Sequence, residues 1–282
     1  MKRMSCLLFS LALFGLLHLP VFGGAQRTKD ENPNNLPNII VQPAPSFKHL
    51  DGQLLVFVAN GVGGSTVVSD NLLDLNGEKQ LGLRIQMVPW CRHNSLFMDL
   101  TDQEAQLKAA ARIACSVSAI RQDCPNAHIF FVGHSAGARV VLAAAEMLPP
   151  QSVDRIIVLA AAVSCTYDLT TALKTSRYGI DNFFSSEDSV LDSENRRYRN
   201  ADGPKTHAAG RAGFHLVSCD KQDIDLYRNV RQYRWTAEHC GNGGHYAWAL
   251  RHNMKNAIVP LFFTAPVFYA PAGEIHIMPA AK

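Results

Sequence analysis

Short apolar runs alternate with amphipathic stretches along the central part of the chain. The apolar runs are bounded by Gly, Pro or polar residues, which is typical of strands buried on both faces of a sheet. They cover residues 54–59, 83–88, 127–132, 155–160 and 179–184. The stretches that predict helices cover residues 65–75, 101–124, 138–148 and 169–174. This order of strand and helix predicts an α/β fold with a mostly parallel central sheet and helices on both faces.

The longest of these helices has a readable start. Thr101-Asp102-Gln103-Glu104 has the pattern of a capping box. In that pattern the Thr101 hydroxyl accepts from the N–H of Glu104, whose carboxylate returns to the N–H of Thr101. The sequence therefore predicts that this helix begins at Thr101 and ends before Pro125.

Two segments break the alternation. Residues 26–52 carry many Pro and Asn residues and predict an extended leader before the folded domain. Residues 192–236 combine Arg, Gly and Asn, and a long excursion of this kind usually borders a site. We expect its arginines to be solvated, with an acidic substrate as the alternative partner. The α/β domain then spans residues 53–262, followed by a tail over 263–282.

The amino terminus has the features of a secretory signal. Lys2 and Arg3 precede an almost wholly apolar stretch over residues 4–22, and Gly23-Gly24-Ala25 supplies small residues for cleavage near Ala25. An uncleaved anchor is the alternative, but the polar residues 26–35 favour cleavage. We therefore expect residues 1–25 to be removed and the protein to be periplasmic or extracellular. No later segment has eighteen uninterrupted apolar residues, so no stable transmembrane span is expected in the mature chain.

Composition and charge argue against some classes of binding partner. The chain has 282 residues, of which 47% are hydrophobic and 18% charged, as expected for one large globular domain. The net charge is +3, and no run of five basic residues occurs. Nucleic acid and polybasic membrane binding are therefore not expected. Composition leaves the oligomeric state open.

Six cysteines remain after the signal is removed. Export favours at least one disulfide among them, with buried free thiols as the alternative. Their spacing matches no metal site, so no metal is expected, and it does not select a pairing. They are Cys91, Cys115, Cys124, Cys165, Cys219 and Cys240.

Gly133-His134-Ser135-Ala136-Gly137 carries the most specific chemical signal. It matches G-x-S-x-G and lies between an apolar strand and an apolar helix that stops at Pro149-Pro150. A serine at such a turn presents its hydroxyl, and larger side chains at the two glycines would collide with the strand or the helix. A glycine-rich turn without chemistry is the alternative. The context favours a nucleophilic serine.

A serine nucleophile needs a base to take its proton and an acid to orient that base. On an α/β sheet both should follow the serine, on loops after later strands. Asp188, just past the strand that ends at Phe184, is our first choice for the acid, and Glu187 is its rival. Asp181 lies inside the strand and is expected to be structural.

His245 is our choice for the base. It follows the glycine-rich stretch 240–244 and precedes a helical run over 246–255. Glycines give such a loop the freedom to bring an imidazole over the serine. The alternatives are His239, His215, His207 and His252.

Two backbone N–H groups should stabilise the oxyanion that forms during acyl transfer. One is expected from Ala136, directly after the serine. The second is expected from the loop after the first strand, from Val62 or Gly61. The alternative is that glycine serves this loop only by adopting positive φ.

The motif around Ser135, followed by Asp188 and then His245, resembles α/β-hydrolase-fold serine hydrolases of the esterase and lipase kind. The resemblance covers about residues 53–262. It implies an eight-stranded, mostly parallel sheet, a Ser–His–Asp triad at its carboxyl edge and no cofactor. Many such enzymes have His-Gly at the oxyanion loop, where this chain has Asn60-Gly61-Val62-Gly63-Gly64. The excursion before His245 also does not resemble a helical lid.

These features together predict an exported serine hydrolase. We expect it to cleave a carboxylic ester of a small molecule, a lipid or a sugar through an acyl-enzyme intermediate. The same triad could serve an amidase, a peptidase or an acyltransferase. The alternative that is not an enzyme is a secreted binding protein that kept the fold and lost the activity.

Overall fold

The computed structural model describes residues 47–93, 95–192, 199–217 and 220–264. The expected signal peptide, most of the leader and nearly all of the tail lie outside these residues. By its contacts the chain separates into a unit at Met1–Phe47 and a unit at Lys48–Lys282. All the elements below belong to the second unit.

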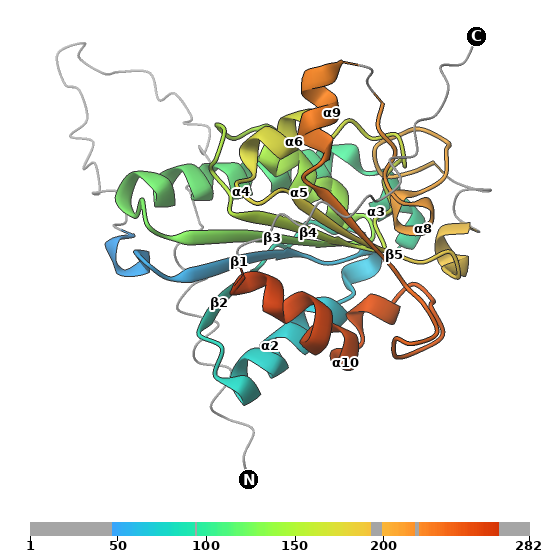
Figure 1. The fold of residues 1–282 in the computed structure, drawn as a ribbon, viewed down its shortest axis with the longest axis horizontal. Helices are drawn as coiled ribbons and strands as arrows, with labels where there is room; N and C mark the ends of the chain where they lie inside the picture. The colour runs from blue at the N-terminus through green and yellow to red at the C-terminus, as the bar shows by residue number, and fades with distance from the viewer. Residues whose placement is uncertain (1–46, 94, 193–198, 218–219, 265–282) are drawn as a thin grey trace, which may run out of the picture. The chain divides into compact units, whose positions relative to one another are not determined.

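A parallel sheet forms the centre of this unit (Figure 1). Its strands lie in the order β2-β1-β3-β4-β5-β6, and every neighbouring pair is parallel. The strands are β1 (Leu54–Ala59), β2 (Leu83–Met87), β3 (His128–His134), β4 (Arg155–Leu159), β5 (Ile180–Phe184) and β6 (Val230–Arg234). The predicted α/β-hydrolase fold is confirmed. The described part of the chain has six strands in this sheet, compared with the eight that the resemblance implies.

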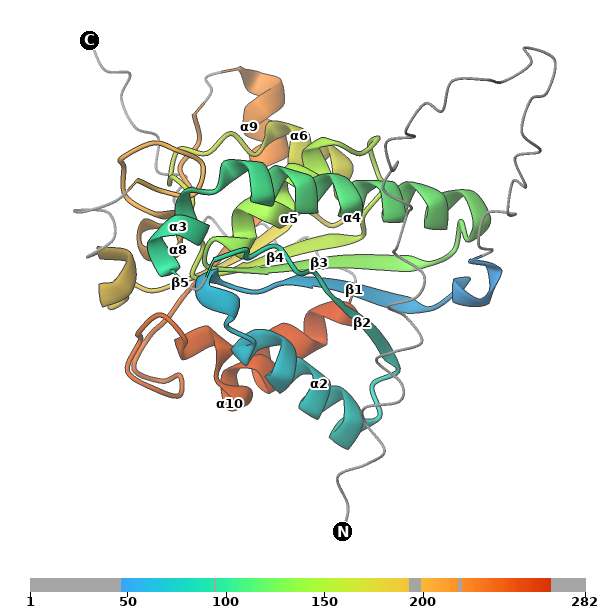
Figure 2. The same ribbon diagram turned by 180° about the vertical axis from the view of Figure 1, so that it is seen from behind.

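Helices cover both faces of the sheet. In Figure 1, α2 (Val67–Lys79) and α10 (Arg251–Asn253) lie below it, and α4 (Gln103–Asp123), α5 (Gly137–Glu146) and α6 (Thr170–Thr175) lie above it. Figure 2 shows the same two layers from behind, with α2 next to α10. The core between α2 and the sheet contains buried side chains from five strands, including Val56, Leu83, Val132, Ile157 and Phe183.

The direction of winding reverses at β1. The chain moves outward from β1 to β2 through α2, and then returns past β1 to β3 through α4. Because parallel crossovers are right-handed, the reversal puts α2 and α4 on opposite faces. The crevice outside the carboxyl ends of β1 and β3 is where open α/β sheets bind ligands. The loop after β1 and the turn that contains Ser135 both begin there.

The prediction for the start of the long helix was wrong. Thr101 is the last residue of a separate helix, α3 (Leu96–Thr101), and its hydroxyl donates to the carbonyl of Phe97. Asp102 caps α4 instead, because its carboxylate accepts from the N–H of Ala105 at 2.9 Å. Asp and Thr are both good capping residues, so adjacent candidates are hard to separate by sequence alone.

The excursion over 192–236 is more regular than its composition suggests. It contains α8 (Ala209–Ala212), α9 (Lys221–Tyr227) and β6, which completes one edge of the sheet. The side chains of β6 are half-buried or exposed. An edge strand without a continuous apolar run gives no buried-strand signal.

The expected disulfide is not found among the described cysteines. No disulfide joins any two of the described cysteines Cys91, Cys115, Cys124, Cys165 and Cys240. Cys219 lies outside the described residues. Across the part of the chain that the structure describes, no helix is long and apolar enough to cross a membrane.

Candidate active site

Ser135 occupies a sharp turn between β3 and α5. Its φ is 55°, a left-handed conformation that a residue with a side chain seldom adopts. Hydrogen bonds to neighbouring backbone hold it there: the Ser135 N–H donates to the carbonyl of Leu159, and its own carbonyl accepts from Ala162, both at 3.0 Å. Strained backbone that its surroundings enforce is typical of a nucleophile at an elbow.

Steric crowding explains why both Gly133 and Gly137 of the motif are glycines. A Cβ on Gly133 would lie 2.7 Å from the Cα of Ala138, and one on Gly137 would lie 2.1 Å from the carbonyl oxygen of Ala59. Neither backbone neighbour can move without displacing α5 or β1. The steric prediction for this motif is confirmed.

Asp188 and His245 meet although 57 residues separate them. The Nδ1 of His245 lies 2.7 Å from Oδ2 of Asp188, and both side chains are buried. A carboxylate only accepts, so the imidazole donates from Nδ1, and in the neutral ring Nε2 is then the acceptor. The other carboxylate oxygen, Oδ1, accepts from the N–H of Leu191 at 3.1 Å. Asp188 is therefore held at both oxygens, and it holds the histidine in the tautomer that a general base requires.

The rival residues lie elsewhere. Glu187 is exposed and accepts from the hydroxyl of its neighbour Ser186. Asp181 is fully buried and binds Arg155 and Arg231, which agrees with a structural role.

The alternative histidines have partners of their own or lie outside the core. His239 contacts Thr236 and packs against Trp248, and the ring of His252 contacts Asn256. His207 is exposed, and His215 is half-buried.

His134 connects the serine turn to the loop that carries His245. Its Nε2 lies 3.3 Å from the carbonyl oxygen of His245, so Nε2 carries the proton that this bond needs. Its ring centroid lies 4.9 Å from that of His245 and 5.1 Å from that of Tyr246, on which it stacks. Since His134 adjoins Ser135, these contacts place the His245 loop beside the elbow.

Burial keeps His134 neutral. Desolvation, and then the nearby His245, lower the pKa of the His134 imidazole to about 3. A neutral neighbour adds no positive charge beside His245 when that imidazole becomes protonated. Sequence analysis placed His134 next to the serine but missed this contact with His245, because the two residues are 111 positions apart.

The oxyanion loop, residues Asn60–Gly64, lies directly against the elbow. A Cβ on Gly61 would lie 3.0 Å from Nδ1 of His134 and 3.2 Å from the Cβ of Ser135. A side chain at this position would crowd both residues, so glycine favours this close approach. Among the residues that the structure describes, no protein acceptor is found for the N–H groups of Gly61, Val62 and Ala136. Backbone N–H groups without a protein acceptor near a strained serine are candidates to stabilise a developing negative charge.

Two side chains of the loop after β2 hold the carbonyls of the oxyanion loop. Nε1 of Trp90 donates to the carbonyl of Asn60 at 2.8 Å, and the Cys91 thiol contacts the carbonyl of Gly61 at 3.5 Å. Burial, assisted by nearby Asp99, raises the pKa of the Cys91 thiol to about 11. The thiol therefore keeps its proton at neutral pH and can donate.

A model of the cutinase family matches residues 62–189 of this chain, a span that includes Val62, Ser135 and Asp188. The chain is a serine hydrolase with the α/β-hydrolase fold. It is of the esterase and lipase kind. The matched span ends before His245, so the choice of base in this hydrolase depends on the geometry described above. No curated protein sequence matches the chain.

Several solved structures are similar to this hydrolase. The poly(3-hydroxybutyrate) depolymerase LpqC from Bordetella parapertussis is 14% identical, with 77% of this chain and 83% of that chain covered and a TM-score of 0.49. An acetylxylan esterase is 14% identical, with 74% of this chain and 96% of that chain covered and a TM-score of 0.42. Trichoderma reesei cutinase with a phosphonate inhibitor is 19% identical, with 45% of this chain and 61% of that chain covered and a TM-score of 0.34. At this distance the likeness concerns the fold and not the substrate.

Proposed function

We propose that this hydrolase cleaves a carboxylic ester through an acyl-enzyme intermediate, with Ser135 as nucleophile, His245 as base and Asp188 as the acid that orients the base. The observation that carries the proposal is the buried hydrogen bond between Nδ1 of His245 and Asp188. The loop that carries His245 contacts the elbow through His134. No metal or cofactor is required for this route.

In the first half of the reaction, Oγ of Ser135 attacks the ester carbonyl carbon while Nε2 of His245 takes the hydroxyl proton. The bond to the alcohol oxygen then breaks, and His245 returns the proton to that oxygen, which leaves as the alcohol. In the second half, water attacks the acyl-serine and His245 again takes and returns one proton. The carboxylic acid leaves, and Ser135 regains its hydroxyl. Asp188 stabilises the transient imidazolium of His245 without being protonated.

The negative charge on the carbonyl oxygen is met by the N–H of Ala136 together with the N–H of Val62 or Gly61. Each such donor typically lowers the barrier by roughly 2.7–4 kcal/mol. Ala136 lies at the amino end of α5, where the helix dipole adds to this stabilisation. The unused N–H groups described above support this assignment.

Apolar side chains near the oxyanion loop support an ester with an apolar part. Leu96, Phe97 and Met98 on α3 are all exposed, and Leu96 is 62% exposed. A Cβ on Gly63 would lie 2.6 Å from a methyl group of Leu96, so this side chain covers the oxyanion loop. An acyl chain bound there would remove apolar surface from water.

The proposal includes export. Cleavage near Ala25 would remove the signal, residues 26–52 would form the leader and residues 53–262 the hydrolase domain, with a tail over 263–282. Amino-terminal sequencing of the protein from the culture medium or periplasm tests the cleavage site. An intact Met1 on the mature protein would contradict it.

A fluorophosphonate probe tests the proposed nucleophile. Such probes react covalently with an activated serine, so peptide mass spectrometry should find the adduct on Ser135. His245→Ala should abolish labelling, whereas His252→Ala should leave it unchanged. If the folded wild-type protein is not labelled, the chain is a binding protein with this fold. Matched ester and amide substrates of the same acyl group then separate an esterase from an amidase.

A further inference from the structure

The direction of the N–H groups in the oxyanion loop follows from how its carbonyls are held. The carbonyl of Asn60 points toward Trp90 and that of Gly61 toward Cys91. In a trans peptide the C=O and the N–H of the next residue point in opposite directions. The N–H groups of Gly61 and Val62 therefore point away from the loop after β2. This is the arrangement that a donor to the oxyanion needs.

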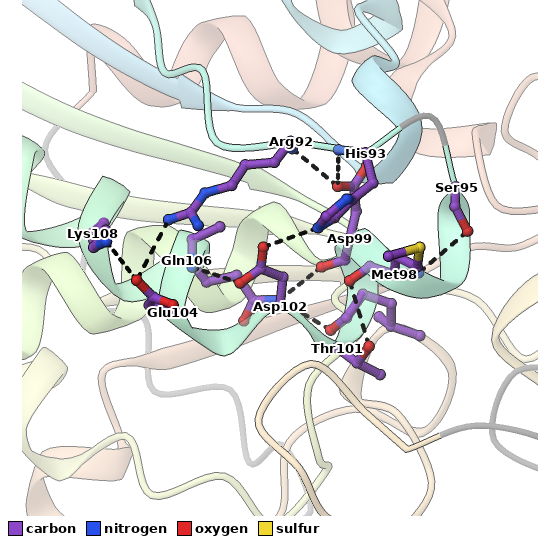
Figure 3. Close-up of polar contacts among 12 residues, drawn as sticks. Arg92, His93, Ser95, Met98, Asp99, Thr101, Asp102, Glu104, Gln106 and Lys108 are labelled. Carbon is purple, nitrogen blue, oxygen red and sulfur yellow. Dashed lines mark hydrogen bonds and ion pairs between the residues drawn. The ribbon is translucent and has the colours of Figure 1, made fainter.

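One carboxylate completes the attachment of this loop. Asp99 on α3 is only 1% exposed, yet it forms no ion pair among the described residues. Its Oδ2 accepts from the N–H of Gly63 at 3.0 Å. Its Oδ1 accepts from the N–H groups of Arg92 and His93, at 3.1 and 3.0 Å. Figure 3 shows the carboxylate below the backbone of Arg92 and His93.

A buried carboxylate is costly unless several donors compensate it. Here the compensating donors are backbone N–H groups from two loops that are distant in sequence. Asp99 thus links the oxyanion loop, one residue beyond Val62, to the same loop that holds the carbonyls of Asn60 and Gly61. Without the bond from Gly63 to Asp99, the peptide group between Val62 and Gly63 could rotate, and the position of Val62 would be less well fixed.

We infer that Asp99 is a positioning residue for the oxyanion hole: its carboxylate fixes the oxyanion loop so that the N–H groups of Gly61 and Val62 face the reacting carbonyl oxygen. Asp99 does not touch the substrate. The inference rests on the proposed acyl-enzyme chemistry. Because displacements of about 1 Å in a catalytic group can cost roughly 10²-fold in rate, a link of this kind matters.

Asp99→Asn is the test, because asparagine has the same shape. Its amide nitrogen is a donor, so in either orientation one of the two loops loses its acceptor. We expect kcat for a chromogenic ester to fall about 10- to 100-fold with KM within about twofold, since the interaction acts on the transition state. The inhibition constant of an aryl boronic acid, which forms a tetrahedral adduct on the serine, should rise by the same factor.

Asp102→Asn is the matched control. Asp102 is a nearby carboxylate that caps α4 and contacts the ring of His93 (Figure 3). Among the described residues it has no hydrogen bond to the oxyanion loop. The asparagine oxygen can still cap α4, and kcat and boronate affinity should stay within about twofold of wild type. Equal losses in both variants would overturn the inference, and so would an Asp99→Asn variant with wild-type kcat and boronate affinity.

A measurement on the wild-type protein covers the case in which Asp99→Asn does not fold. Hydrogen exchange of the ¹⁵N-labelled enzyme should show a slow amide at Gly63 before any ligand binds, because Asp99 holds it. The amides of Gly61 and Val62 should become slow only after the boronic acid binds. A fast Gly63 amide in the free enzyme would contradict the inference. Ester hydrolysis that survives Ser135→Ala would instead refute the proposed function.

Discussion

Replacing His134 with glutamine should reduce the loss of unfolding free energy that the protein suffers as the pH falls below 6.5. The glutamine Nε2 can occupy the place of the histidine Nε2 and still donate to the carbonyl of His245. The variant therefore removes the titrating group and keeps the contact. His49→Gln makes the same chemical change at an exposed position and is the matched control.

The size of the effect follows from proton linkage. The pKa of His134 is about 3 in the folded protein, compared with 6.5 for an ordinary histidine. Below pH 6.5 the unfolded chain binds a proton that the folded chain does not, so this group's stabilisation is complete above that pH and is lost as the pH falls toward 3. The slope reaches about 1.4 kcal/mol per pH unit, and the loss at pH 4.5 is about 2.7 kcal/mol.

Urea denaturation at pH 7.5, 6.5, 5.5 and 4.5 measures this difference. Other groups titrate in both proteins, so the quantity of interest is the wild-type profile minus that of His134→Gln. The difference should change by about 2.7 kcal/mol across this range, and His49→Gln should follow the wild type. Parallel profiles for the wild type and His134→Gln would refute the assignment of a buried, neutral imidazole.

Three further experiments test other residues of the elbow, of the triad and next to the oxyanion loop. Asp188→Asn should lower kcat by about 10⁴-fold through the wrong His245 tautomer, whereas Glu187→Gln should retain activity; steady-state kinetics would contradict us if the two effects were reversed. Gly137→Ala should destabilise the fold by roughly 1–3 kcal/mol in urea, because its Cβ would lie 2.1 Å from a carbonyl oxygen of β1, and an unchanged midpoint would count against the steric role. Trp90→Phe should lower kcat about fivefold, since one hydrogen bond of about 1 kcal/mol to the oxyanion loop is lost, and an unaltered kcat would argue against that anchor.

The parts of the fold that the sequence predicts are those with local signals. Strands buried on both faces are continuous apolar runs, so β1, β3, β4 and β5 are readable within one or two residues. The elbow is readable because its glycines have a steric function that a short motif expresses. Asp188 and His245 follow from their positions after later strands, a consequence of parallel topology.

The missing parts depend on long-range contacts. β6 is an edge strand whose polar residues look like a loop until β5 pairs with it. The contact of His134 with His245 spans 111 positions, and that of Gly63 with Asp99 spans 36. Their residue types are ordinary, and only the folded arrangement gives them a role. The capping error at Thr101 has a different origin, because two good capping residues stand side by side.

The central claim is that Ser135 forms an acyl-enzyme with a carboxylic ester. The most direct measurement is hydrolysis of a series of chromogenic esters of increasing acyl length by the wild type and by Ser135→Ala. We predict that the wild type turns over at least one of them and that Ser135→Ala loses that activity by about 10⁶-fold while remaining folded. Equal rates for the two proteins would contradict the claim.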